Sequence, residues 1–389
     1  MIKTNFRTII NYSILILFPI IILELTSFLI ILLFTNTGIT DNNMFVNLYR
    51  DGSVYKKVDI PSNIFHPYIG WTHPKNTKIN TSKLCSKDTY IYTNKLGQST
   101  VPGFNKNSEK IIVFLGGSTI FGVGSTDNAH TIPSLVQRKL ISQGLSNYSV
   151  VNLGLRGAQS FQELMVLYRY IMYGGKTDWV IDLSGRNDAY HAAFEKDIKY
   201  SLIPMHPHRT ALKIRKMQDG RGAPIYIHGL LQGARYYSFT LDLISRFLTK
   251  FYGTGNNDIT MRTDLENDKT SISMWVDSTI RNYTMIDRLT KYNNGKYVMI
   301  LQPTAYTKQK LTNSEHLCIK NTERLKYYKE YEKLFFNEVN NKEKPFPFYD
   351  ARYIFSENLK TLHYVDNIHY NDEAADALAN YIVNIIVNK

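Results

Sequence analysis

From Ile111 onward, the chain alternates short apolar runs with amphipathic stretches of helical length, and this pattern constrains the fold more than any other feature. The first run, Ile111 to Leu115, is continuously apolar and ends at Gly116-Gly117, as expected of a strand that is buried on both faces. Strands that alternate with helices form a parallel sheet covered by helices on both sides. The pattern therefore predicts an α/β fold.

The predicted elements continue to the end of the chain. Strands are expected at residues 111–115, 149–152, 179–183, 297–301 and 346–349. Helices are expected at residues 131–141, 160–172, 274–292, 322–339 and 371–387. Ligands of parallel sheets bind beyond the carboxyl ends of the strands, so a site is expected in the loops that follow the strands.

Four loops in this region carry polar groups that can work together. They are Gly116-Gly-Ser-Thr119, Asn152-Leu-Gly-Leu-Arg-Gly157, Gly185-Arg-Asn-Asp188 and Asp366-Asn-Ile-His369. Each pattern alone is more often a turn, a helix cap or a surface pair than part of an active site. All four in this order, beside predicted strands and the last helix, favour one composite site.

The residue types in these loops suit the transfer of an acyl group. The hydroxyl of Ser118 is a weak nucleophile until a base accepts its proton, and His369 is a base of the right kind. Asp366, three residues earlier in the chain, can reach back to orient the imidazole ring. The oxyanion of a tetrahedral intermediate needs N–H donors, which the backbone of Ser118 and Gly157 and the side chain of Asn187 can supply.

These motifs resemble those of the SGNH/GDSL hydrolase superfamily, which is named after its Ser, Gly, Asn and His residues. The turn before Ser118 matches the family's Gly-Asp-Ser turn, except that Gly117 stands where many members have Asp. The spacing in the second motif places the oxyanion glycine at Gly157 rather than at Gly154. The Gly-x-Asn-Asp and Asp-x-x-His motifs are complete, and the resemblance covers about residues 110–389.

The resemblance implies a flavodoxin-like three-layer α/β fold and a Ser-His-Asp triad that acts without a metal or other cofactor. It assigns the catalytic roles to Ser118, His369 and Asp366, and the oxyanion hole to Ser118, Gly157 and Asn187. Members of the family hydrolyse or transfer ester-linked acyl groups. Membrane-anchored bacterial relatives look like enzymes that trim or acylate cell-surface polysaccharide.

Residues 13–34 form a stretch of 22 mostly apolar residues near the N-terminus. As a helix, this stretch would cross the ~30 Å hydrocarbon core of a bilayer. Lys3 and Arg7 precede it, so the positive-inside rule places the N-terminus in the cytoplasm and the remainder outside. A cleaved signal peptide is the competing interpretation, but its apolar region would be shorter. Glu24 lies near the middle of this stretch, where a charged side chain is costly. Three explanations are open: the side chain is protonated, it pairs with another helix, or it is tolerated in a lone anchor.

The predicted organisation has four parts: a cytoplasmic tail at 1–12, a transmembrane signal anchor at 13–34, an irregular approach segment at 35–109 and an SGNH hydrolase-like domain at 110–389. This organisation predicts a single-pass protein of the bacterial cell membrane, with its catalytic domain in the periplasm or outside the cell. Cys85 and Cys318 would then lie in an oxidising compartment. Two alternatives remain open for them: a disulfide between the two, or two buried free thiols.

The chain carries 46 Lys and Arg against 33 Asp and Glu, and this net charge of +13 favours an anionic partner. A basic insertion at about 190–272 interrupts the α/β pattern and is expected over the carboxyl edge of the sheet. Residues 199–221 gather six Lys or Arg against one Asp. An acidic glycan or lipid headgroups suit these charges better than nucleic acid does in an exported domain, although a solvated basic loop explains them equally well.

Three functions fit these features. The leading one is a membrane-anchored, extracytoplasmic serine esterase that removes acyl groups, above all acetyl, from a cell-surface glycan. The first alternative is a polysaccharide O-acetyltransferase that uses the same triad with a sugar acceptor in place of water. The second alternative is a glycan-binding protein that keeps the fold without the activity, and the four complete motifs argue against it.

Overall fold

The computed structural model of this 389-residue chain describes residues 18–27, 29, 64–66, 69–83, 85–86, 88–192, 240, 265–319, 325–341, 345–355 and 363–388. The chain divides into two compact units: Met1–Pro61 with Arg209–Asp258, and Ser62–His208 with Ile259–Lys389. The second unit contains the predicted α/β region.

A five-stranded parallel sheet forms the centre of the second unit, with the strand order β6-β5-β7-β8-β9. The strands are β5 (Lys110–Gly116), β6 (Tyr148–Asn152), β7 (Trp179–Ser184), β8 (Lys296–Leu301) and β9 (Phe348–Asp350). All five predicted strands are present close to their expected ranges. In chain order the arrangement is 2-1-3-4-5, which is the flavodoxin-like order that the resemblance implied.

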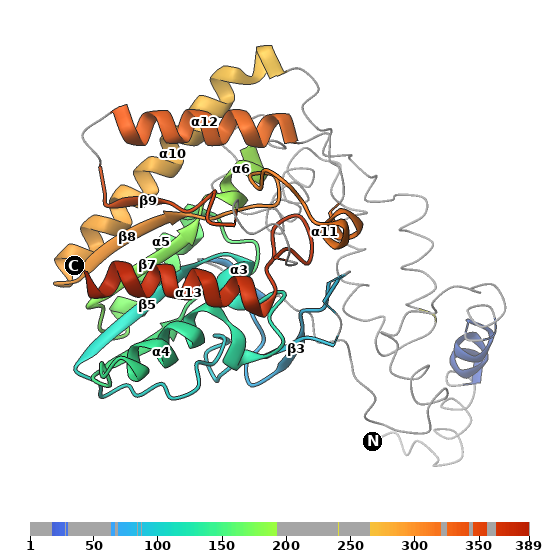
Figure 1. Ribbon diagram of the computed structural model, residues 1–389. Coiled ribbons are helices and arrows are strands. Elements are labelled where there is room, and N and C mark those ends of the chain that lie inside the picture. Colours follow the sequence, from blue (N-terminus) through green and yellow to red (C-terminus); the bar gives the residue numbers. More distant parts are fainter. Residues whose placement is uncertain are drawn as a thin grey trace, which may run out of the picture. The chain divides into compact units, whose positions relative to one another are not determined.

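Helices cover both faces of the sheet, which explains why its central strands are apolar on both sides (Figure 1). One face carries α4 (Ile132–Ser142) and α13 (Asp372–Val387), and the other carries α5 (Ser160–Met172), α10 (Leu265–Tyr292) and α12 (Leu325–Asn341). Successive residues of β5 divide between the two cores: Ile112 and Phe114 pack in the first, and Val113 and Leu115 pack in the second. The predicted three-layer α/β architecture is therefore confirmed.

The helices differ from expectation at two points. Helix α10 begins at Leu265 rather than at residue 274, because its first turns are mostly polar in sequence and show no apolar period. Short helices that the pattern did not predict are α3 (Ser118–Phe121), α6 (Arg186–Ala192) and α11 (Asn313–Cys318). The expected insertion at 190–272 lies outside the described residues, apart from its two ends and Thr240.

Residues 35–109, expected to be irregular, contain two small antiparallel sheets in the part that the structure describes. These sheets pair β1 (Ile64–His66) with β2 (Gly70–Thr72) and β3 (Lys78–Asn80) with β4 (Tyr90–Tyr92). Strands of three residues are too short to show an alternating pattern in the sequence. Trp71 packs with Leu155, and Ile91 packs with Phe121, so this segment shares its core with the α/β region.

In the first unit, residues 18–27 are helical and their apolar side chains are mostly exposed. Glu24 Oε2 accepts a hydrogen bond from the backbone N–H of Thr240 at 3.3 Å. None of the helices in the described ranges combines the length and the apolar character that crossing a bilayer requires. The predicted anchor at 13–34 extends beyond the described residues at both ends.

Candidate active site

Ser118 lies at the carboxyl end of β5, where the strand passes directly into the short helix α3. Gly116 makes this turn with a φ of +143°, a conformation that residues with a side chain rarely adopt. A Cβ at Gly116 would also collide with Ile120 and with the carbonyl of Leu183. The apolar strand thus brings Ser118 to the side of the sheet where the strands have their carboxyl ends. There its side chain is only partly buried.

Ser118 and His369 are hydrogen-bonded although they lie 251 positions apart in the chain, with 2.7 Å between Oγ and Nε2. The other ring nitrogen of His369, Nδ1, lies 2.7 Å from Oδ2 of Asp366. Asp366 Oδ1 also accepts hydrogen bonds from the backbone N–H groups of Ile368 and His369, at 2.9 and 2.8 Å. The structure therefore brings the three residues singled out in the sequence into one chain of hydrogen bonds.

The charge of Asp366 decides the tautomer of His369. Burial acts to raise the pKa of Asp366, but the charge and hydrogen bonds of His369 and the N–H of Ile368 outweigh burial and hold that pKa well below its usual range. An ionised carboxylate can only accept a hydrogen bond, so Asp366 selects the tautomer with a proton on Nδ1. Nε2 is then unprotonated and accepts the hydrogen bond of the Ser118 hydroxyl, as a general base must.

A second segment of the chain also reaches Asp366. Lys83 Nζ lies 3.6 Å from Oδ2 of Asp366. Shortly after Lys83 comes Cys85, which forms a disulfide with Cys318 of α11. The disulfide, one of the two alternatives that the sequence left open, is therefore confirmed. The contact of Lys83 with Asp366 was not predicted, because no local pattern marks a lysine so distant in the chain.

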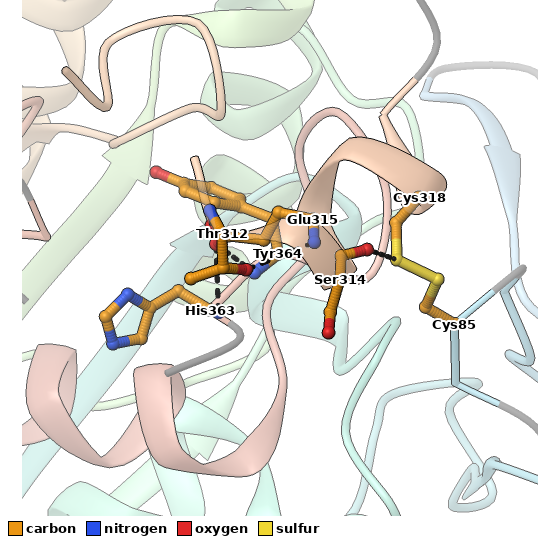
Figure 2. The surroundings of a disulfide bond; sticks show 7 residues. All are labelled: Cys85, Thr312, Ser314, Glu315, Cys318, His363 and Tyr364. Carbon is orange, nitrogen blue, oxygen red and sulfur yellow. Dashed lines mark hydrogen bonds between the residues drawn. A yellow bond between two sulfur atoms is a disulfide. The ribbon is translucent and has the colours of Figure 1, made fainter. Parts of the chain in front are cut away.

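Helix α11 contacts the segment that leads into Asp366, and Figure 2 shows Glu315 of this helix beside His363 and Tyr364. Glu315 of this helix accepts hydrogen bonds from the backbone N–H groups of His363 and Tyr364, at 3.0 and 3.3 Å. The Glu315 carboxylate is fully buried and lies 2.8 Å from Nζ of Lys308. Because Tyr364 shortly precedes Asp366, the disulfide, α11 and Glu315 form one connected support for this loop.

This support predicts that the disulfide contributes to activity as well as to stability. The full-length variant Cys85→Ser/Cys318→Ser should lose about 2–5 kcal/mol of unfolding free energy. It should also turn over an ester more slowly, because the loop around Asp366 is held less firmly. Thermal unfolding and kcat, each with and without a reducing agent, measure both effects. The wild type should respond to the reductant and the double variant should not, so an unresponsive wild type would contradict the prediction.

The predicted oxyanion donors come from the first turns of α3 and α6 and from the loop that ends at Gly157. Asn187 Nδ2 is so close to Gly117 that a Cβ there would collide with it, which suits a glycine where the family often has Asp. Asn187 also donates a hydrogen bond from Nδ2 to the carbonyl of Ala158 at 2.7 Å, which holds the amide beside the loop of Gly157. Within the described chain, no hydrogen bond engages the backbone N–H of Ser118 or Gly157, so both groups are available to an oxyanion.

Two residues of the N-terminal segment hold the loop that ends at Gly157, and the sequence indicated neither role. Trp71 donates a hydrogen bond from Nε1 to the carbonyl of Arg156 at 2.9 Å, and the Arg156 N–H donates to Nε2 of His73 at 3.3 Å. Burial and the nearby charge of Arg156 lower the pKa of His73 to about 3. The His73 ring is therefore neutral at neutral pH and can accept this hydrogen bond.

Asp188, the last residue of the Gly-x-Asn-Asp motif, belongs to a buried group of three carboxyls. It accepts hydrogen bonds from the backbone N–H and the hydroxyl of Ser160, at 3.1 and 2.7 Å. The other two members are Glu163 and Asp182, both fully buried. Burial is the largest cause that raises the pKa of all three, and it raises the pKa of Asp182 to about 8. Asp182 therefore keeps its proton at neutral pH in the folded protein.

The raised pKa of Asp182 predicts that the folded protein loses stability as the pH rises from about 4 to about 8. Unfolding releases a proton in that range, so each pH unit lowers the unfolding free energy by up to about 1.4 kcal/mol. The melting temperature, followed from about pH 5 to pH 8, should fall for the wild type and vary less for Asp182→Asn. The exposed Asp88→Asn should behave like the wild type. A wild-type melting temperature that stays constant or rises would contradict this.

No protein-family model and no curated protein matches the chain. Solved structures similar to it include an acetyl xylan esterase, AlAXEase, with 13% identity, a TM-score of 0.39 and coverage of 71% of this chain and 99% of that one. A variant of Axe2, an acetyl-xylooligosaccharide esterase from Geobacillus Stearmophilus, has 15% identity, a TM-score of 0.39 and coverage of 72% and 94%. A GDSL-like lipase from Bacteroides thetaiotaomicron has 14% identity, a TM-score of 0.34 and coverage of 72% and 89%.

These neighbours include a protein of the GDSL type, the family that the four motifs resemble. The resemblance to the SGNH/GDSL hydrolases is carried by those motifs, and the contacts that join Ser118, His369 and Asp366 agree with it. Structural similarity at this level of identity does not assign an activity. The activity is therefore inferred from the site residues.

Proposed function

We propose that this protein is a serine esterase in which Ser118 attacks an ester-linked acyl group. His369 acts as the base, and Asp366 orients its ring. The observation that carries the proposal is the chain of hydrogen bonds from Ser118 through His369 to Asp366, with 2.7 Å for each contact. A serine in a plain turn has no means of losing its proton, whereas Ser118 has an oriented base within reach.

In the first half-reaction, Oγ of Ser118 bonds to the acyl carbon while its proton passes to Nε2 of His369. The negative charge that develops on the carbonyl oxygen is stabilised by the N–H groups of Ser118 and Gly157 and by the amide of Asn187. The bond to the leaving alcohol then breaks, and the alcohol oxygen takes the proton from His369. Water repeats these steps on the acyl-enzyme and releases the acid and the free serine.

The proposed substrate is an acyl ester, above all an acetyl ester, on a cell-surface glycan, and residues 13–34 are proposed to anchor the protein in the bacterial cell membrane. The disulfide between Cys85 and Cys318 supports a location in an oxidising compartment outside the cytoplasm. The net charge of +13 supports an acidic glycan over a neutral one. The exposed apolar side chains of residues 18–27 are compatible with a lipid environment.

Transfer to a sugar hydroxyl is the alternative to hydrolysis, because the same acyl-enzyme serves both reactions and the acceptor decides between them. A glycan-binding protein without activity is the third candidate. It is less favoured, because binding alone has no need of a base that is hydrogen-bonded to both Ser118 and Asp366.

The test uses the purified full-length protein in detergent with an O-acetylated oligosaccharide. The wild type should release acetate and Ser118→Ala should not. A second, unacetylated oligosaccharide in the same reaction shows by mass spectrometry whether acetyl groups pass to it, which would favour the acetyltransferase. A wild type no more active than Ser118→Ala, both on the oligosaccharide and on a chromogenic acetyl ester, would contradict both enzymes and favour the binding protein.

A further inference from the structure

A cavity of about 580 Å³ opens between α12 and the loops that follow β8 and β9. Tyr306 comes from the loop after β8, and Arg352 comes from the loop after β9. The cavity therefore lies at the carboxyl edge of the sheet, the same edge that presents Ser118 after β5.

The cavity is connected to the Asp366–His369 loop through Asn367. Asn367 donates a hydrogen bond from Nδ2 to the hydroxyl of Tyr306 at 2.5 Å, and its carbonyl accepts one from the N–H of Ala305 at 3.1 Å. A wall residue of the cavity thus contacts the turn that positions His369.

Arg186 directly precedes the oxyanion residue Asn187 in the chain and stacks on an aromatic ring that lines this cavity. It is 4% exposed, and its guanidinium lies 3.4 Å from the ring centroid of Tyr328 and 5.8 Å from that of Tyr306, both of which line the cavity. Its Nε and Nη1 are buried and have no hydrogen-bond partner among the described residues. Arg186 therefore adds a positive potential behind the Tyr328 ring, and this potential acts through space on an anion in the cavity.

The cavity lining carries more positively charged side chains than there are carboxylates to neutralise them. Lys308 is paired with Glu315, and Arg352 with Asp350, so these two charges are largely neutralised. The exposed Lys329 and Lys333 of α12 form no ion pair with described residues. Glu332 is the acidic side chain in the described lining, and the charges of Arg186, Arg352 and Lys329 all act on it.

The rings in the same lining suit a sugar. Tyr306, Tyr328, Phe336 and Tyr353 all line the cavity. Aromatic faces supply apolar contact area, while the lysine ammonium groups supply charge-assisted hydrogen bonds to a carboxylate. A ligand with both an apolar ring face and a carboxylate matches this combination, and a uronic acid is a sugar of that kind.

We propose that this cavity is a subsite that binds a carboxylated sugar of the glycan substrate. Lys329 and Lys333 contact the carboxylate, Arg186 strengthens the binding through its charge behind the Tyr328 ring, and the remaining rings contact the sugar. The inference rests on the proposed function, in that it names the sugar class which the esterase would select. It places the preference for an acidic glycan on described residues rather than in the insertion at 190–272.

The test measures binding apart from turnover, with the full-length Ser118→Ala variant and titration calorimetry. The two probes are a short O-acetylated oligogalacturonide and the same compound with its carboxyl groups reduced to alcohols. The acidic probe should bind about tenfold more tightly, as expected of two or three ion pairs of modest individual strength. The difference should shrink at about 1 M salt, where charges are screened within about 3 Å.

Variants that remove single groups of charges show which side chains produce the preference for the acidic probe. Lys329→Gln/Lys333→Gln changes two exposed side chains and should remove most of the preference for the acidic probe. Lys110→Gln/Lys296→Gln removes the same charge where β5 and β8 begin, at the opposite edge of the sheet, and should keep the preference. Arg186→Gln, if it folds, should lower the preference further.

Equal affinity for the two probes, or equal effects of the two lysine pairs, would overturn the subsite. The experiment distinguishes failure of the subsite proposal from failure of the esterase proposal. Acetate release by the wild type without a preference for the acidic probe would overturn the subsite alone. A preference for the acidic probe in a wild type that cannot release acetate would support the cavity and overturn the esterase.

Discussion

Replacing His369 with alanine should lower kcat for an acyl ester by about 10³-fold or more, because the members of a triad act as a unit. Without Nε2 at 2.7 Å, Oγ of Ser118 has no acceptor for its proton when it attacks. Asp366→Ala should cost less, since backbone hydrogen bonds from Val365 N–H to the His369 carbonyl and from Ala305 N–H to the Asn367 carbonyl also hold this turn. Steady-state kinetics on a chromogenic acetyl ester measure these losses.

His130 provides a matched control for this prediction. It follows Asp127 at the same Asp-x-x-His spacing, with Nδ1 2.8 Å from Oδ1, but it has no serine partner among the described residues and is 39% exposed. His130→Ala should therefore retain the wild-type kcat. Near-normal turnover in His369→Ala, or equal losses in the two histidine variants, would contradict the assignment of His369 as the base.

Replacing Asn187 with alanine should lower kcat by about 10²–10³-fold with little change in KM, as expected when one oxyanion donor is removed. The amide acts on charge that develops in the transition state, so substrate binding should be nearly unaffected. Gly117→Ala should produce a related loss, because the added methyl collides with Nδ2 of Asn187 and displaces the amide.

The two substitutions should not be additive. If Gly117→Ala acts by displacing Asn187, the double variant should be little worse than Asn187→Ala alone, and a double-mutant cycle measures the difference. A fully additive loss would indicate that Gly117 acts in another way. An effect of Asn187→Ala confined to KM would make Asn187 a substrate-binding residue instead of an oxyanion donor.

The parallel sheet was predictable because its strands are buried on both faces, and continuous apolar runs such as Ile111 to Leu115 have few alternatives. The candidate site was predictable for a related reason. Its residues follow the ends of those strands or precede the last helix, and the fold brings such loops to one edge of the sheet. Ser118 and His369 could therefore be expected to meet without any local link between them.

The surroundings of the site were not predictable in the same way. Strands of three residues show no period, and the polar first turns of α10 resemble a loop. Trp71 and Lys83 act through contacts with Arg156 and Asp366 that are distant in the chain, and neither lies in a recognisable motif. Only the pair of cysteines hinted that the N-terminal segment is fixed to the rest of the domain.

The central claim is that Ser118 is a nucleophile activated by His369, and labelling with a fluorophosphonate tests it most directly. The probe forms a covalent bond with an activated serine, and peptide mass spectrometry of the treated full-length protein identifies the site. We expect one labelled serine, Ser118, with labelling lost in Ser118→Ala and much slower in His369→Ala but unchanged in His130→Ala. Labelling at another serine, or undiminished labelling in Ser118→Ala, would contradict the claim.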